Sequence, residues 1–303
     1  MSWDPWLGAG HDDQPLLFLT AHDGSMIGRW DIETGQNVWR DGDGVSCCND
    51  GVLVRLPDGI MSLVIATEDG IEWWDALRGQ HRPEMTWDGW TICALTVGAM
   101  PDGRPVVFGA GQNGAVYRWN GSDGQLLGAS DEKDEPCSMM AVASVPVPGG
   151  AGVIVSGDEV GQIWRWDPTS GDQVGEPIMA HASQVRIIEP LPLVGEPLFA
   201  SSDQEGVLRR WSALTGAPVG PPIETGTEVY ALTSARVGRW GTLFSAGADE
   251  IVRAWDAYTG EPIDFSVPGV VASALTQPDG TALLATGTAQ GNVIVRVCGF
   301  DIS

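Results

Sequence analysis

The segment Ile163-Trp164-Arg165-Trp166-Asp167 is one version of a pattern that returns along the whole chain. A short β-prone run ends on a tryptophan in six places, at Trp30, Trp74, Trp119, Trp166, Trp211 and Trp255. These tryptophans are separated by 44, 45, 47, 45 and 44 residues. A seventh run ends at Val297, 42 residues after the last of them, with the tryptophan replaced. A period of this size indicates a repeat architecture in which each unit is one supersecondary element.

Each unit also repeats the same succession of strands and turns. An apolar run such as Ile92–Met100 comes first, and a Pro-Asp-Gly turn such as Pro101-Asp102-Gly103 follows it. Proline presets φ and glycine accepts positive φ, so these tripeptides are typical of hairpin turns. A second apolar run, the tryptophan-bearing run, a Thr-Gly type of turn such as Thr259-Gly260 and a short outer run complete the unit. The pattern therefore predicts four antiparallel strands per unit.

A lone four-stranded sheet cannot bury both of its faces, whereas radial stacking of several sheets covers them all. We therefore predict one all-β domain, a seven-bladed β-propeller with blades at about 1–43, 44–87, 88–132, 133–179, 180–224, 225–267 and 268–303. The repeat tryptophans are expected to be wedged between neighbouring blades. A row of tryptophans that binds carbohydrate or cations is the functional alternative, but a strictly periodic residue is usually structural.

The dipeptides Trp30-Asp31, Trp74-Asp75, Trp166-Asp167 and Trp255-Asp256 resemble the Trp-Asp signature of the WD-repeat β-propeller family, at the right period. The resemblance covers essentially the whole chain. It implies the propeller fold, and it is nearly silent about function.

The family's stabilising polar residues are poorly matched. A Gly-His dipeptide often precedes the first strand in the family, and only Ala180-His181 comes close to it here. The aspartate expected six residues before the tryptophan is matched by Asp249, with Glu68 and Glu205 as acidic substitutes. The resemblance thus implies that the family's His–Asp–Ser/Thr–Trp hydrogen-bond network is mostly absent, and that apolar packing holds the ring.

The closure of the ring differs from the other units. Residues 1–9 can supply one strand, so the first unit is expected to begin at its innermost strand. The chain ends shortly after the third strand of the last unit, Val293–Val297. We expect a three-stranded seventh blade, or one completed by a short segment at Gly299–Ile302. An unpaired outer edge invites strand addition by a partner or by a second copy, and so predicts edge-mediated self-association as one outcome.

The charge balance limits the partners. The formal net charge is −24, with 40 acidic and 16 basic residues, and Lys133 is the sole lysine. Such a field repels phosphate backbones and anionic lipid, so nucleic acid and membrane are not expected as partners, whereas a basic protein or a cationic ligand is compatible. Solubility is the simpler explanation of the same charge. No apolar run approaches the roughly 20 residues that span a bilayer, and the N-terminus lacks signal-peptide features, so we expect a cytoplasmic protein.

The sequence offers no familiar catalytic or metal-binding constellation. Its cysteines, Cys47, Cys48, Cys93, Cys137 and Cys298, show no Cys-x-x-Cys spacing and do not pair with the histidines at finger-like spacing. No phosphate-binding, nucleophile-elbow or zinc-protease motif appears in the strand–helix context that it requires, because Gly109-Ala110-Gly111 lies in a predicted hairpin and not before a helix. We therefore expect free thiols, no metal and no cofactor, and we lean against an enzyme.

Propeller geometry directs the search to the mouth of the central channel. Aligning the repeats places Trp3, Asn49, Cys93, Ser138, Arg186, Tyr230 and Ser273 at the start of the innermost strands. A second ring lies in the turns before the tryptophan strands and comprises His22, Glu68, Asn113, Glu159, Glu205 and Asp249. The candidate binding residues are Trp3, Trp90, Cys93, His181, Arg186, Tyr230, Glu205 and Asp249. For each, the simpler interpretation is that any channel mouth is partly polar.

A periodic arginine requires a separate interpretation. Arg29, Arg118, Arg165 and Arg210 each immediately precede a repeat tryptophan, and Arg296 is present in the seventh unit. A ring of ligand-binding charges is the functional alternative. Because the residue follows the repeat, we expect each arginine to lie half-buried between blades, paired with a nearby acid or a backbone carbonyl.

These features favour a scaffold that presents its channel mouth and loops to a protein or peptide. The alternative is an enzyme or small-molecule binder in the mouth, with Tyr230, Arg186, His181 and Cys93 as acid, anion clamp, base and nucleophile. A third hypothesis is a sugar-binding propeller that uses the tryptophans outside the repeat, Trp39, Trp87, Trp90 and Trp240.

Overall fold

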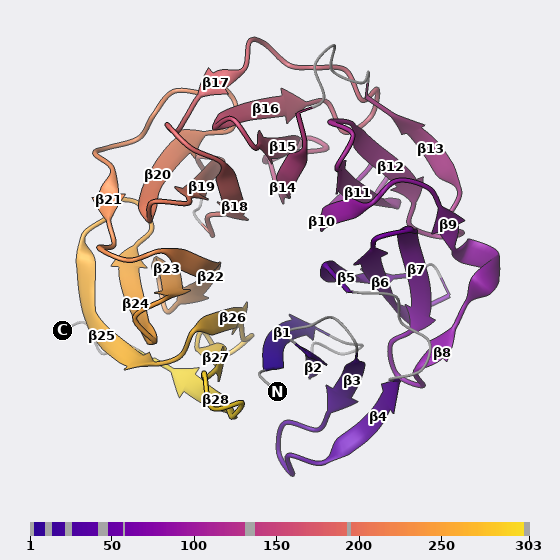
Figure 1. Cartoon of the computed structure of the whole chain (residues 1–303), viewed down its shortest axis with the longest axis horizontal. Helices are drawn as coiled ribbons and strands as arrows, with labels where there is room; N and C mark the ends of the chain where they lie inside the picture. The colour runs from indigo at the N-terminus through magenta and orange to yellow at the C-terminus, as the bar shows by residue number, and fades with distance from the viewer. Residues whose placement is uncertain are drawn as a thin grey trace.

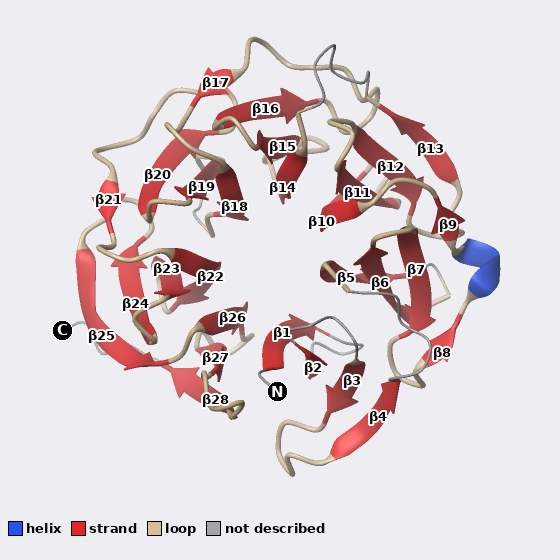
Figure 2. Cartoon of the chain, viewed as in Figure 1, coloured by secondary structure: helices blue, strands red, loops and turns tan. Residues whose placement is uncertain are grey.

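The computed structural model describes residues 3–9, 14–21, 26–41, 48–56, 58–130, 137–192 and 195–299. Seven antiparallel sheets stand around a central axis like the blades of a propeller, with the first and last sheets side by side (Figure 1). Strands dominate, and the helix visible in Figure 2 is the three-residue 3₁₀ helix η2 (Pro83–Met85). Among the described residues no helix is long and apolar enough to cross a membrane. The predicted seven-bladed fold is confirmed.

Within each blade the strands follow chain order from the channel outwards. Blade one comprises β1 (Trp3–Ala9), β2 (Pro15–Ala21), β3 (Ile27–Trp30) and β4 (Asn37–Asp41). Blade two comprises β5 (Asp50–Arg55), β6 (Met61–Thr67), β7 (Gly70–Asp75), β8 (Gln80–His81) and β9 (Trp87–Asp88). Blade three comprises β10 (Ile92–Ala99), β11 (Pro105–Gly111), β12 (Val116–Asn120) and β13 (Leu126–Ala129). Blades four and five comprise β14 (Met139–Val145), β15 (Val153–Asp158), β16 (Gln162–Trp166) and β17 (Ile178–Met179); and β18 (Val185–Pro190), β19 (Leu198–Asp203), β20 (Val207–Ser212) and β21 (Ile223–Glu224). Blades six and seven comprise β22 (Val229–Val237), β23 (Trp240–Gly247), β24 (Ile251–Asp256) and β25 (Pro262–Pro268); and β26 (Val271–Thr276), β27 (Ala282–Gly287) and β28 (Val293–Cys298).

Two blades depart from the four-stranded plan. In blade two the outer strand is divided, because β8 and β9 pair with different parts of β7 on either side of η2. Blade seven has three strands among the described residues, as expected for a chain whose first unit begins at its innermost strand. Residues 300–303, which include most of the segment considered for completing this blade, lie outside the described residues.

The core lies between the blades. All seven residues of β6 are buried, so both faces of this strand are covered by neighbouring sheets. Apolar clusters join adjacent blades, as where Phe244 of blade six packs in one cluster with Leu284 of blade seven. The repeat tryptophans Trp119 and Trp211 are 0% and 4% exposed. Burying such a side chain contributes roughly 2–3 kcal/mol, so the blades are stable only as a ring.

Three repeat tryptophans are fixed by the same hydrogen bond. In blades four, five and six the indole N–H donates over 2.9 Å to a buried serine on the neighbouring strand. The pairs are Trp166–Ser156, Trp211–Ser201 and Trp255–Ser245. A buried indole N–H that lacks a partner would lose the solvation it had in water, so the serine stabilises the tryptophan in this position.

Blade five carries the complete polar network that the resemblance led us to expect to be mostly absent. His181 Nε2 lies 2.7 Å from Ser201 Oγ, and His181 Nδ1 lies 3.1 Å from Asp203 Oδ2. The network aspartate is Asp203, eight residues before Trp211, and not the position of Glu205 or Asp249. The sequence comparison placed the aspartate two residues too late, because the carboxylate lies at the end of the preceding strand and not within the turn.

The periodic arginines connect neighbouring blades at the outer rim. Arg118 Nη1 donates to the Thr169 carbonyl over 2.6 Å, from blade three to blade four. Arg165 Nη1 donates to the Leu214 carbonyl over 2.7 Å, from blade four to blade five. Arg210 donates to a carbonyl of blade six in the same way. The expectation that these residues are structural is confirmed for these three arginines.

Arg296 does not belong to this arginine row. In blade six the repeat tryptophan, Trp255, pairs with Leu243 of the second strand. In blade seven Arg296 pairs with Leu284, which corresponds to Leu243, so Arg296 occupies the position of the repeat tryptophan. Val297, which the spacing indicated, is one residue beyond that position. The Arg296 guanidinium donates to Thr286 Oγ1 over 2.8 Å, as the indoles donate to serine in blades four to six.

A second set of hydrogen bonds links the innermost strands around the channel. A polar side chain of one blade accepts a backbone N–H of the next: Leu95 N–H to Asp50 (2.7 Å), Ser144 N–H to Thr96 (3.0 Å), Ala274 N–H to Thr233 (3.0 Å) and Leu7 N–H to Ser273 (3.0 Å). Glu189 has the same role toward Ser234. Burial raises the pKa of Asp50 to about 6 and that of Glu189 to about 8, although these hydrogen bonds oppose the shift.

Replacing Ser201 by alanine should destabilise the protein more than replacing Ser245. Ser201→Ala leaves both the Trp211 indole and the His181 ring without their shared partner, whereas Ser245→Ala affects one indole. We expect a loss of about 2–3 kcal/mol for the first variant and about 1 kcal/mol less for the second. Urea unfolding followed by circular dichroism measures both, and equal losses would show that the histidine adds nothing.

Replacing Glu189 by glutamine should stabilise the protein in a pH-dependent way. The pKa of Glu189 is about 8 in the folded chain against an ordinary value of 4.5, so ionisation destabilises the fold increasingly as the pH rises from 4.5 to 8. Glutamine keeps an acceptor oxygen and does not ionise, so the gain in Tm over the natural protein should be larger at pH 8 than at pH 5. Thermal unfolding at both pH values tests this, with Glu176→Gln at the exposed outer rim as control. A gain that does not change with pH would contradict the prediction.

Candidate functional site

The innermost strands surround a central channel (Figure 1) whose cavity has a volume of about 510 Å³. Its wall combines small apolar side chains with polar groups, which are Asn49, Asp50, Cys93, Thr96, Arg186, Glu189, Tyr230, Thr233 and Ser273. Several of these groups are already engaged. Asp50, Thr96, Glu189, Thr233 and Ser273 accept backbone N–H groups of neighbouring blades, and Asn49 donates to the Ile92 carbonyl over 2.9 Å. Cys93, Arg186 and Tyr230 therefore remain as the candidate residues that reach the channel.

A β-bulge brings these residues to the channel mouth. In blades three to six the pairing of the innermost strand shifts by one residue near its start, and the extra residues are Cys93, Met140, Arg186 and Tyr230. A bulged residue leaves the ladder and turns its side chain in a new direction. All four line the channel. The blade-four member of this ring is thus Met140, and not Ser138 as the alignment indicated, because Met140 precedes Trp166 by the 26 residues that separate Cys93 from Trp119, whereas Ser138 precedes it by 28.

Arg186 and Tyr230 lie side by side across the junction of blades five and six. The Arg186 guanidinium forms an ion pair with Glu228 and lies 6.0 Å from the centroid of the Tyr230 ring. The Tyr230 hydroxyl lies 3.4 Å from Glu228 Oε2. Because Glu228 already pairs with the guanidinium, an incoming carboxylate would have to displace it. No pattern in the sequence indicates Glu228, which lies 42 residues from Arg186.

Cys93 is poorly suited to act as a nucleophile. Burial raises the pKa of its thiol, which keeps the sulfur protonated near neutral pH. The thiol makes no hydrogen bond to any residue that the structure describes. The imidazole proposed as its base, His181, is held inside blade five and does not line the channel.

His181 is part of the blade and not of the mouth. Its side chain is fully buried between Asp203 and Ser201. Burial lowers the pKa of the imidazole, and the Asp203 carboxylate only partly opposes this effect. A buried neutral imidazole with both nitrogens engaged stabilises the fold and has no free position for a ligand.

Glu205 and Asp249 are exposed in turns on the face where the innermost strands begin, which we call the mouth face. Asp249 forms an ion pair with Arg253 at 2.6 Å. Partial burial raises the pKa of Asp249, but the hydrogen bonds from Arg253 and the Ile251 N–H outweigh this and bring it below its ordinary value. Glu205 is exposed on the same face as the bulged residues Cys93, Met140, Arg186 and Tyr230.

The aromatic candidates differ in their surroundings. Trp90, in the connection before β10, is 55% exposed, and Tyr230 is 43% exposed. The side chain of Trp3 lies outside the described residues. The four tryptophans of the sugar-binding hypothesis do not form one cluster. The Trp39 indole N–H donates to the Ala76 carbonyl between blades, and the Trp87 ring packs against Trp119 with 5.3 Å between ring centroids. Trp240 lies in the β22–β23 hairpin, on the opposite face from Trp90.

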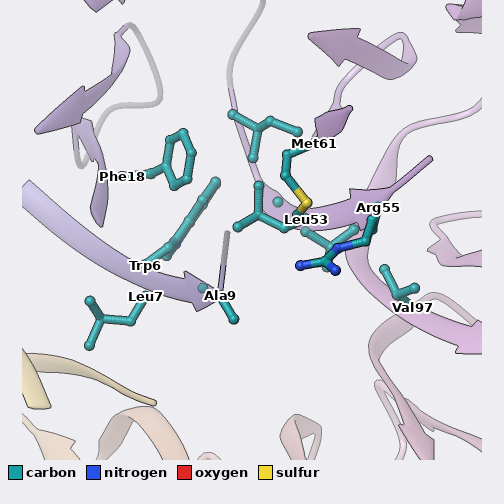
Figure 3. Close-up of a pocket in the computed structure, with 12 residues that line it drawn as sticks. Trp6, Leu7, Ala9, Phe18, Leu53, Arg55, Met61 and Val97 are labelled. Carbon is teal, nitrogen blue, oxygen red and sulfur yellow. The ribbon is translucent and has the colours of Figure 1, made fainter. Parts of the chain in front are cut away.

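A further cavity of about 530 Å³ lies between blades one and two, and no feature of the sequence indicates it. Figure 3 shows Trp6, Phe18, Leu53 and Met61 around it, with Arg55 to one side. Two glycines allow the walls to meet. A Cβ on Gly51 would lie 2.2 Å from Trp6, and a Cβ on Gly8 would lie 2.3 Å from Leu53. The cavity is therefore part of the packing between these blades.

Comparison with known proteins shows the fold alone. No family model matches the chain, and no curated protein matches it in sequence. A chain in the crystal structure of the mitotic checkpoint complex is similar over 97% of this chain and 89% of its own length, with a TM-score of 0.72 and 14% identity. The computationally designed protein Ika8 is similar over 93% of this chain and 80% of its own, with a TM-score of 0.65 and 21% identity. The fold that the structure itself shows is a seven-bladed propeller.

Proposed function

We propose that this protein is an interaction scaffold whose mouth face binds a basic segment of another protein. The observation that carries the proposal is the composition of that face, where exposed carboxylates surround exposed aromatic side chains. The exposed acidic residues of the turns and connections there are Glu68, Asp69, Asp88, Glu159, Glu205, Asp249 and Glu250. The similarity to a chain of a multi-protein complex supports a protein partner.

The charge of the mouth face favours a cationic partner. Arg186 and Arg253 are paired with Glu228 and Asp249, so these arginines do not offset the other carboxylates of the face. The chain as a whole carries −24. A field of one sign steers an oppositely charged partner and speeds its association.

Two aromatic side chains supply apolar anchors among these charges. Trp90 is 55% exposed near the junction of blades two and three, and Tyr230 is 43% exposed in blade six. Aromatic residues dominate binding energy where they become buried against a partner. A lysine or arginine can also lie over such a ring as a cation–π contact, as Arg186 already does over Tyr230.

The second candidate function is binding of a small cationic molecule inside the channel. Its support is the cavity of about 510 Å³, a size typical of ligand pockets, with Asn49 and Tyr230 in its wall. It is the weaker candidate, because Asp50 and Glu189 are engaged in holding the strands together and Cys93 is protonated.

We also propose that the chain is a divergent WD-repeat protein of the cytoplasm. The His181–Asp203–Ser201–Trp211 network supports the family relationship, since it corresponds to the arrangement expected from that family. The described cysteines, Cys48, Cys93, Cys137 and Cys298, are free, which suits a reducing compartment.

Reversing charge on the mouth face should weaken the binding of a basic peptide. We expect Glu159→Lys with Glu205→Lys to lower the affinity for a short fluorescent peptide rich in lysine and arginine by roughly tenfold or more at low salt. The matched control carries Glu176→Lys with Glu261→Lys, both exposed and away from the mouth face, which changes the net charge equally. Fluorescence anisotropy measures both. Equal loss in the two variants would show that only the overall charge attracts the peptide.

A further inference from the structure

Among the described residues, the outer edge of blade seven is unpaired. Across the described residues, β28 pairs with β27 alone, whereas the third strand of every other blade pairs with a fourth. A groove of about 450 Å³ lies beside this edge, between blades seven and one. Its apolar walls are formed by Leu17, Leu19, Trp30, Ile32, Val293 and Val295.

Blade six shows what covers the corresponding place elsewhere in the ring. Its fourth strand, β25, alternates between exposed and half-buried residues. The inward side chains Ile263, Phe265 and Val267 pack against the cluster that joins blade six to blade seven. The Phe265 ring meets Phe244 edge-on, with 5.7 Å between centroids. The fourth strand therefore supplies apolar side chains at alternate positions to the junction with the next blade.

The register of the two blades makes the comparison specific. Leu243 pairs with Trp255 and Leu284 with Arg296, so Val252 and Ala254 correspond to Val293 and Val295. In blade six, β25 pairs with both residues, and they are 0% and 1% exposed. In blade seven both valines are only half-buried, and Val297 is 69% exposed. The repeat tryptophan on the other side of the groove, Trp30, is likewise half-buried.

We infer that the seam between blades seven and one is a second binding site, which accepts an extended segment of a partner protein as the fourth strand of blade seven. The segment runs antiparallel to β28, as β25 does to β24, and pairs with its free backbone groups. It places apolar residues of the size of isoleucine, phenylalanine and valine at every second position, facing Val293, Val295 and Leu19.

The charges around the groove select a partner over a second copy. Asp31 lines the groove, and Glu33 is exposed in the adjoining turn. A positively charged segment is therefore favoured as the added strand. Two copies of this chain would each bring −24 to the contact, which opposes self-association.

The test uses a fluorescent peptide with the inward residues of β25, isoleucine, phenylalanine and valine, alternating with lysine. Its control is the same peptide with alternate backbone amides methylated, which keeps the side chains and removes the strand's donors. We expect methylation to weaken binding by roughly tenfold or more. Amide hydrogen exchange should slow in Val293–Cys298 when the unmethylated peptide binds. Equal affinity of the two peptides would overturn the inference, as would slow exchange of this strand in the free monomer.

Matched variants locate the site. Val295→Lys alters the groove, and Ile294→Lys adds the same charge on the opposite face of β28. We expect at least a tenfold loss for the first and little change for the second. If Val295→Lys lowers the Tm, Ile32→Lys repeats the test, because Ile32 lies in a loop of the groove wall. Equal affinities across these variants, or a dimer in sedimentation experiments that the peptide does not dissociate, would overturn the inference. Glu159→Lys with Glu205→Lys should leave this peptide bound, so failure of the mouth-face proposal is distinguishable.

Discussion

The structure depends on one constraint, which is that each blade has two apolar faces that only its neighbours can cover. The strand β6 shows it most fully, since all seven of its residues are buried. Further from the axis the cover decreases, and β25 is exposed at every second residue. No blade is therefore stable alone, because its stability depends on the contacts with its neighbours.

Polar groups are placed where this packing would otherwise leave them unsatisfied. At the channel, side chains such as Asp50 and Thr96 accept N–H groups that face the neighbouring blade. At the third strand, serine hydroxyls accept the indole N–H groups, and at the rim, arginines such as Arg165 donate to carbonyls of the next blade. Where the partner is missing, the defect is visible. Gly109 of blade three takes the place of the serine, and the Trp119 indole N–H has no hydrogen-bond partner among the described residues.

The sequence predicted the fold well because the period is a property of the whole blade. It predicted single positions less well, since an alignment by spacing does not register a bulge or a change in turn length. This explains why Val297 was expected where Arg296 stands, whereas Ser138 was expected where Met140 lies because blade four was aligned two residues early. A slip of one residue in a strand moves a side chain to the opposite face, so small errors change the role assigned to a residue. The pairing of Arg186 with Glu228 was not predictable, because only the stacking of blade five against blade six brings the two residues together.

The distribution of these features divides the ring into two unlike parts. The bulges, the arginine contacts and the histidine network all lie in blades three to six, where an arginine at the outer rim of each junction adds a polar link to the apolar packing. At the junction of blades seven and one, by contrast, the fully buried cluster comprises only Leu17, Leu19 and Ala285 among the described residues. Recognition at the channel mouth needs side chains such as Arg186 and Tyr230 held in a fixed arrangement, and the well-linked part provides it. Strand addition needs an uncovered edge with apolar surface beside it, and the less covered part provides that. The same repeat thus serves two kinds of binding, because the ring is completed unequally around its circumference.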